Sequence, residues 1–169
     1  MNSKLKDAFQ LHGKVVVITG SVGLLGHKHA EAVAAFGATP ILIDLSKEKV
    51  EKMAIQLKSS YGVESMGCSV DITDEMQIQE NAKMIFNEYG KIDGLINNAA
   101  NNPKVEDKDD NNFSRLENFP IDDWNQDLAV GLTGAFLCAK HYGANIAKNP
   151  AGGSIVNISS DLGLIAPDQ

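Results

Sequence analysis

The fold is decided by the stretch Lys14–Gly26, which is KVVVITGSVGLLG in one-letter code. Its β-branched run predicts a buried parallel strand that ends at Thr19, and the apolar pattern that follows predicts a helix. Three glycines lie between them at a spacing of three. Gly20 permits a sharp bend, Gly23 lets the backbone approach a phosphate, and Gly26 lets the helix pack close to the strand.

The sequence after this turn has the pattern of a dinucleotide-binding βαβ unit. We expect the helix to bury the face that carries Leu25, Ala32, Val33 and Phe36. Its N-terminus offers unpaired N–H groups and a positive dipole end to a pyrophosphate. A second strand, from Thr39 to Asp44, then ends in a carboxylate placed for a ribose 2′-hydroxyl.

Composition favours one soluble domain that spans residues 1–169, with 43% hydrophobic and 22% charged residues. A formal charge of −7 argues against a nucleic acid or an anionic membrane as partner. We find no secretory signal and no run of membrane-spanning length, so we expect a cytoplasmic protein. Cys68 and Cys138 are expected to be buried free thiols, and the histidines show no metal-ligand spacing.

Strands and helices alternate along the rest of the chain. Further strands are expected at 63–70, 94–97 and 154–158, and helices at 46–61, 73–90 and 122–148. Buried helix faces are expected at Val50, Met53, Ala54 and Leu57, and at Ile78, Ala82, Ile85 and Phe86. The expected fold class is α/β, a Rossmann-type doubly wound parallel sheet with helices on both faces, incomplete at its C-terminus.

Two irregular segments interrupt this pattern. Gly131 and Gly134 lie inside the last helix, where they indicate close packing or a local bend. The polar stretch from Asn101 to Asn118 is either a solvated loop or a flap beside the cofactor cleft, and the sequence leaves both open.

The chain resembles the short-chain dehydrogenase/reductase family from Leu11 to about Gly163. The resemblance rests on six elements in the family's order: Leu11–Val15, Thr19-Gly20, Asp44, Asp71-Ile72, Asn97-Asn98-Ala99 with Trp124, and Gly153–Ser160. The Asn-Asn-Ala motif is similar to the classical branch. The segment from Asp127 to Phe136 and the polar stretch are similar to the bacterial subgroup named flagellin modification protein A.

The resemblance implies a role for each matching position. The cofactor would be NAD, bound by Gly20, Gly23, Leu25, Gly26, Asp44, Asp71, Ile72, Asn98 and Ala99. Asp44 would bind the adenosine ribose and repel the 2′-phosphate of NADP, an argument that electrostatics supports; a simple turn aspartate is the alternative. Ser160 would be the catalytic serine that hydrogen-bonds the substrate oxygen, whereas Ser159 is expected to face the sheet.

Three departures from the family pattern matter. The spacing of Gly20, Gly23 and Gly26 is that of the extended branch, and Gly131 replaces the family's helix asparagine. The third is that no Tyr-x-x-x-Lys follows Ser160, so the family's proton donor is missing from this sequence.

We therefore expect the N-terminal portion of an NAD-dependent oxidoreductase that interconverts an alcohol and a carbonyl, with a sugar-like small-molecule substrate. This chain by itself is expected to be inactive. Exposed apolar side chains such as Leu132 and Phe136 predict a homo-oligomer. Two alternatives stay open: an extended-type nucleotide-sugar epimerase or dehydratase, and a non-catalytic NAD-binding module.

Overall fold

The computed structural model describes residues 9–101 and 116–160. Five parallel strands form one sheet in the order β3-β2-β1-β4-β5. Their bounds are Val15–Thr19 for β1, Thr39–Asp44 for β2, Met66–Ser69 for β3, Gly94–Asn97 for β4 and Ser154–Asn157 for β5. In register, Val17 of β1 lies opposite Ile41 of β2 and Leu95 of β4.

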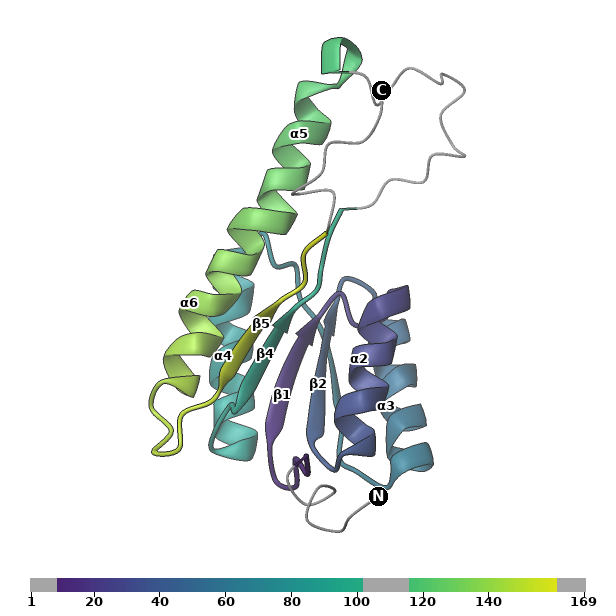
Figure 1. Cartoon of the computed structure of the whole chain (residues 1–169), viewed down its shortest axis with the longest axis vertical. Helices are drawn as coiled ribbons and strands as arrows, with labels where there is room; N and C mark the ends of the chain where they lie inside the picture. Colours follow the sequence, from purple (N-terminus) through teal and green to yellow (C-terminus); the bar gives the residue numbers. More distant parts are fainter. Residues whose placement is uncertain (1–8, 102–115, 161–169) are drawn as a thin grey trace.

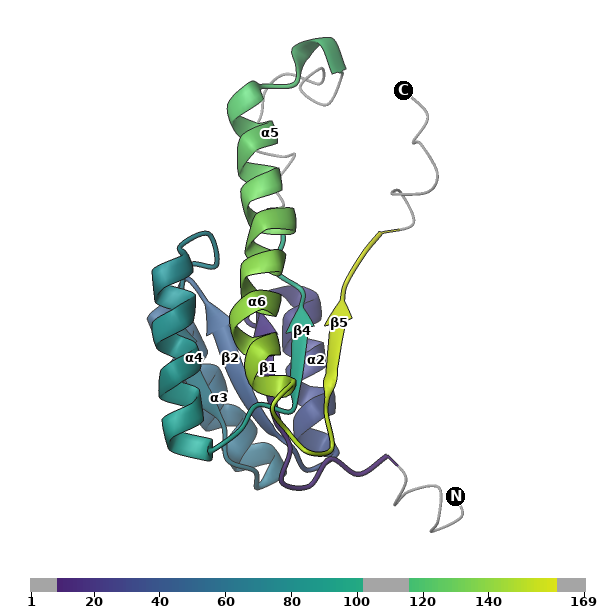
Figure 2. The same ribbon diagram turned by 90° about the vertical axis from the view of Figure 1, so that its left-hand side faces the viewer.

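Helices cover both faces of this sheet (Figures 1 and 2). α2 (Leu24–Ala35) and α3 (Lys47–Tyr61) bury one apolar cluster, whereas α4 (Glu75–Tyr89) and α6 (Ala135–Ile146) bury another on the opposite face. The predicted doubly wound α/β fold is thereby confirmed. Carboxyl ends of all five strands lie at the same edge of the sheet, because every pairing is parallel.

Most predicted elements occur close to their expected bounds. The strand expected at 63–70 is shorter, and the helix after it begins at Glu75, with Asp74 instead of Thr73 as its N-cap. Asp74 Oδ1 accepts hydrogen bonds from the N–H groups of Met76 and Gln77 at 2.9 and 3.3 Å. Asp74 is therefore the N-cap of this helix in place of Thr73, whose hydroxyl donates to Asp71 Oδ1 at 2.7 Å.

The predicted buried face of α2 is wrong for three of its four residues. Leu25, Ala32 and Phe36 are exposed, whereas Val33 is buried as predicted. The other buried residues of this helix are small: Gly26, Ala30 and Ala34. α2 lies so close to the turn after β1 that a Cβ on Gly26 would overlap the Gly20 carbonyl oxygen. Only small side chains fit this contact, so the large apolar ones are left outside it.

The last predicted helix is a rod of three segments. α5 (Ile121–Leu128) follows a short 3₁₀ turn, η2 (Leu116–Asn118), and runs through a π-helix, η3 (Ala129–Gly134), into α6. A Cβ on Gly134 would lie 2.8 Å from the Ile72 side chain, so this glycine marks a close contact, as predicted. The rod extends past the carboxyl ends of the strands (Figure 1), which brings α5 above that edge of the sheet.

Both cysteines are buried free thiols, as predicted. Burial raises the pKa of Cys138 to about 12 and also raises the pKa of Cys68, so neither thiol is activated. The polar stretch 101–118 lies mostly outside the described residues, which leave out 102–115. No described helix is long and apolar enough to cross a membrane.

Candidate cofactor site

The turn after β1 is built by glycines that pack against the end of β4. Gly20 has a φ of +61°, and a Cβ there would lie 2.8 Å from Ala99 Cα. Gly23 is the N-cap of α2, and that helix has no acidic residue in its first turn. The helix N-terminus therefore presents backbone N–H groups without competition from a carboxylate, as an anion requires.

Thr19 joins this turn to the segment after β4. Its buried Oγ1 accepts from the N–H groups of Asn98 and Ala99 at 3.0 and 3.1 Å. The Asn98 side chain in turn donates to the carbonyls of Thr19 and Gly20 at 3.0 and 3.1 Å. These four bonds hold two segments nearly 80 residues apart in the sequence in one fixed arrangement.

Asp44 ends β2 beside the same turn. Its Oδ2 accepts from Val22 N–H at 3.2 Å and its Oδ1 from Leu45 N–H at 2.9 Å. The buried Ser21 hydroxyl adds a bond to the Ile43 carbonyl at 3.2 Å. An ionised carboxylate has about four acceptor positions, so Asp44 keeps capacity for a ligand's hydroxyl groups. It is thus both a turn residue and a candidate ribose ligand.

Asp71 and Ile72 follow β3 and form the next part of the wall. Asp71 Oδ1 accepts from the Thr73 N–H at 2.8 Å, and the Asp71 N–H donates to Gln77 Oε1 at 3.0 Å. Ile72 is buried and touches Gly134 of the π-helix. The wall after β3 is therefore fixed both by its own turn and by the rod.

These segments enclose a cavity of about 530 Å³ at the carboxyl ends of the strands. Eight of the nine predicted cofactor residues line it; Gly26, the ninth, is buried behind the turn. Asn101, the first residue of the polar stretch that the sequence offers as a loop or a flap, also lines the cavity. Sequence reasoning assigned no role to the other lining residues: Leu24, Ile43, Leu45, Val70, Ala100, Gln126 and Val130. The size is that of a cofactor or small-molecule site.

A second cavity of about 400 Å³ adjoins the first and shares Ile72 and Ala99 with it. Ser159 lines it and so does not face the sheet, contrary to the prediction, whereas the exposed Ser160 is not among its lining residues. Asn97 Nδ2 donates to Asn157 Oδ1 at 2.8 Å in the wall of this cavity. Asn157 and Ser159 are two residues apart along an extended strand end, which brings them to the same side.

The described tyrosines offer no proton donor to either cavity. Tyr142 is fully buried, its hydroxyl donates to Asn81 Oδ1 at 2.9 Å, and burial raises its pKa well above the ordinary value. Among the described residues, no group of three or more His, Cys, Asp and Glu side chains is placed to hold a metal ion. What these residues fit is a dinucleotide, with glycines and a helix N-terminus for the phosphates and a carboxylate for a ribose.

The fold and this cavity define an α/β protein of the dinucleotide-binding Rossmann class. A family model described as short chain dehydrogenase matches residues 14–168. The chain belongs to this family of short chain dehydrogenases.

Three relatives illustrate the match. D-threitol dehydrogenase of Mycolicibacterium smegmatis is 33% identical over 164 residues, which cover 95% of this chain and 58% of that protein. NADP-dependent mannitol dehydrogenase of Alternaria alternata is 30% identical over 97% of this chain and 59% of that protein. The crystal structure of NAD+-bound xylitol dehydrogenase aligns with a TM-score of 0.78 at 30% identity, covering 92% of this chain and 56% of that one. This chain thus spans somewhat more than half the length of each relative.

Proposed function

We propose that residues 1–169 form the dinucleotide-binding domain of an NAD-dependent oxidoreductase that interconverts an alcohol and a carbonyl. The cofactor, when bound, would accept or donate the hydride. The observation that carries the proposal is the shared cavity: Gly20 and Gly23, Asp44, Asp71, and Asn98 line one space at the carboxyl ends of four strands. That edge is where open α/β sheets bind their ligands.

Asp44 supports NAD over NADP. The relatives include an NAD+-bound and an NADP-dependent enzyme, so they leave this preference open. A carboxylate about 4 Å from a phosphate is repelled by roughly 4 kcal/mol per unit charge at an effective dielectric constant of 20. Bonds to Val22 and Leu45 hold the Asp44 carboxylate at the cavity wall, so it cannot simply turn away.

The substrate class that we propose is a small polyol or the corresponding keto sugar. Threitol, mannitol and xylitol dehydrogenases are all among the relatives, which favours this class over an epimerase or dehydratase. Ser160, at the end of the strand motif, is our candidate for the hydroxyl that hydrogen-bonds the reacting oxygen. Its neighbour Ser159 lines the second cavity. Because Tyr142 is buried and engaged, we expect this chain by itself to bind NAD without turnover.

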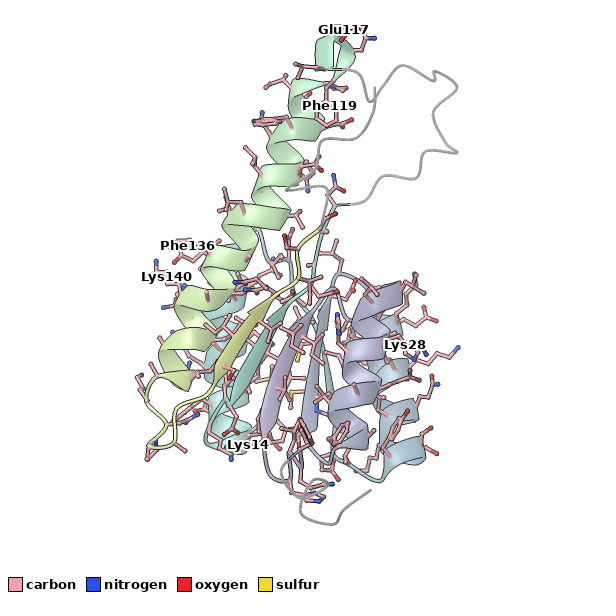
Figure 3. All side chains as sticks on the ribbon, in the orientation of Figure 1. Lys14, Lys28, Glu117, Phe119, Phe136 and Lys140 are labelled. Atoms are coloured by element: carbon pink, nitrogen blue, oxygen red, sulfur yellow. The ribbon has the colours of Figure 1, made fainter. Side chains whose placement is uncertain are left out.

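The rod supports a proposal of self-association. Exposed apolar side chains follow one another along α5, η3 and α6: Ile121, Trp124, Leu128, Leu132 and Phe136. Phe136 and Lys140 project outward from α6 (Figure 3). Such a stripe in water favours a homo-oligomer.

Free buried thiols at Cys68 and Cys138 fit a reducing cytoplasmic compartment.

Titration with NADH, followed by the change in nicotinamide fluorescence, tests the proposed function. The wild-type chain should bind, and Gly23→Leu should weaken binding at least about tenfold, because its side chain would occupy the phosphate position. Ala32→Leu, on an exposed part of α2, is the matched control and should bind as the wild type does. Absence of binding by the folded wild-type chain would refute the proposal.

A further inference from the structure

One polar side chain in the first cavity comes from an element to which the sequence assigned no cofactor contact. Gln126 lies on α5, is exposed, and lines the cavity together with Val130 of η3. Within the part of the chain that the structure describes, the Gln126 amide group has no hydrogen-bond partner. A primary amide offers two donors and an acceptor, so this group is available to a ligand.

The helix face that carries Gln126 is held toward the cavity by contacts on both sides of it. Val130 is four residues further on, hence on the same face, and packs against the buried core cluster around α4 and α6. Asp127 Oδ1 accepts from Asn101 Nδ2 at 2.9 Å, which ties α5 to the segment after β4. The position of this helix face beside the cavity therefore follows from packed neighbours.

Gln126 and Val130 line the cavity together with the wall after β3, which contributes Asp71 and Ile72. Gly134 packs on Ile72, so the π-helix that continues α5 lies against the wall after β3. That wall, with Asp71, is beyond the Asp44 carboxylate in the sheet order β1-β2-β3. With the phosphates at the turn after β1 and a ribose at Asp44, the base comes next.

We propose that Gln126 is a further cofactor-binding residue that recognises the adenine base by its amino-group edge. A glutamine amide can accept from the adenine N6 amino group and donate to N7, a two-bond pairing that is specific for adenine. This proposal rests on the proposed dinucleotide binding and adds a residue for base selection. It names a determinant that lies on α5, outside the glycine and asparagine motifs.

The test compares NADH with reduced nicotinamide hypoxanthine dinucleotide, in which an oxygen replaces the N6 amino group. Gln126→Met keeps the length of the side chain and removes the amide, while Gln79→Ala, at an exposed position of α4, controls for a glutamine change elsewhere. Wild type and Gln79→Ala should prefer NADH over the hypoxanthine analogue. Gln126→Met should lose about fivefold to tenfold of that preference, through weaker NADH binding and little change for the analogue.

The outcomes separate the two proposals. If Gln126→Met binds each dinucleotide as tightly as the wild type does, Gln126 does not recognise the base, although the proposed function stands. If Gln126→Met weakens both dinucleotides equally, the side chain supports the wall and reads no base, which also overturns this proposal. If the folded wild type binds neither dinucleotide, the proposed function fails and this proposal with it.

Discussion

β1 and β5 are parallel strands of one sheet, yet every residue of β1 is buried and every residue of β5 is exposed. β1 lies between β2 and β4 and has helices on both faces. β5 pairs only with β4 among the described strands and contacts α6 on one face. The comparison teaches that the part of the cavity proposed for the phosphates and ribose, built on β1 and β2, is preformed. The part at Ser159 and Ser160 is built on a strand with little packed around it.

Gly26→Ala should show the largest effect, because it enters the preformed region. The new methyl group would overlap the Gly20 carbonyl and crowd Ser21 Cα, and these backbone atoms cannot move aside as a flexible side chain can. We expect a loss of at least about 3 kcal/mol in the free energy of unfolding. The matched control is Gly131→Ala, whose Cβ would meet no described atom within 4 Å. Denaturant unfolding measures the stability of both variants. Equal stabilities would contradict the claim that the region around Gly26 is preformed and tightly packed.

Thr19→Val should cause the next largest loss of unfolding free energy, because Thr19 joins the turn after β1 to the segment after β4. It leaves the N–H groups of Asn98 and Ala99 without their acceptor, at a cost of about 2 kcal/mol. NADH affinity should fall as well, because the same bonds position the cavity wall. Thr39→Val, at the half-buried start of β2, is the control. A Thr19→Val chain with unchanged unfolding and unchanged NADH binding would show that the junction is unimportant.

Asp93→Asn should have an intermediate effect on the free energy of unfolding. Asp93 lies just before β4, at the amino ends of the strands, opposite the cavity. The Asp93 carboxylate accepts from Val15 N–H at 2.9 Å and pairs with Lys14 and Lys91 at 3.0 and 3.1 Å. Lys14 lies at that lower edge in Figure 3. We expect a loss of about 1.5 kcal/mol at pH 7, measured by urea unfolding.

The pH dependence of this change has a defined sign. Burial raises the pKa of Asp93, but the Val15 N–H bond and the two lysines outweigh it, so the pKa lies below its ordinary value. A lowered folded-state pKa stabilises the protein above the unfolded value of about 3.9, and the stabilisation is lost as the pH falls through the folded value. The difference between wild type and Asp93→Asn should therefore shrink below about pH 4. A constant difference would exclude the ionised carboxylate as its source.

Phe136→Glu should have the smallest effect on stability, within about 0.5 kcal/mol, because Phe136 is 62% exposed. Its effect on assembly should be large, since it introduces a charge into the apolar stripe of the rod. Light scattering should show a smaller assembly than for the wild type. Glu88→Gln, at an exposed position of α4, serves as control. A wild-type chain that is already monomeric at high concentration would refute self-association through this stripe.

Local patterns sufficed for the strands and for the motif residues. β1, β2 and β4 are short runs bounded by turn residues, and their predicted positions match the observed ones. Half of the residues that line the first cavity were predicted, because glycine spacing and an acid at a strand end have specific physical uses. The buried face of α2 was missed because periodicity selects large apolar residues, whereas close packing selected Gly26 and Ala30.

Contacts between residues far apart in the sequence could not be predicted from local patterns. Thr19 bonds to Asn98 and Asp93 bonds to Val15 across nearly 80 residues of sequence, and no local pattern announces either pair. Gln126 lies in α5 without a motif, and only the path of the rod brings it to the cavity. Glycines inside the last helix did indicate its irregularity, but not that it takes the form of a π-helix.

The most direct test of the central claim is the relative affinity of this chain for NADH and NADPH. The account predicts that NADH binds at least about tenfold more tightly, because the Asp44 carboxylate repels the 2′-phosphate, and that Asp44→Asn reduces this preference. Equal affinities, or tighter binding of NADPH by the wild type, would contradict it.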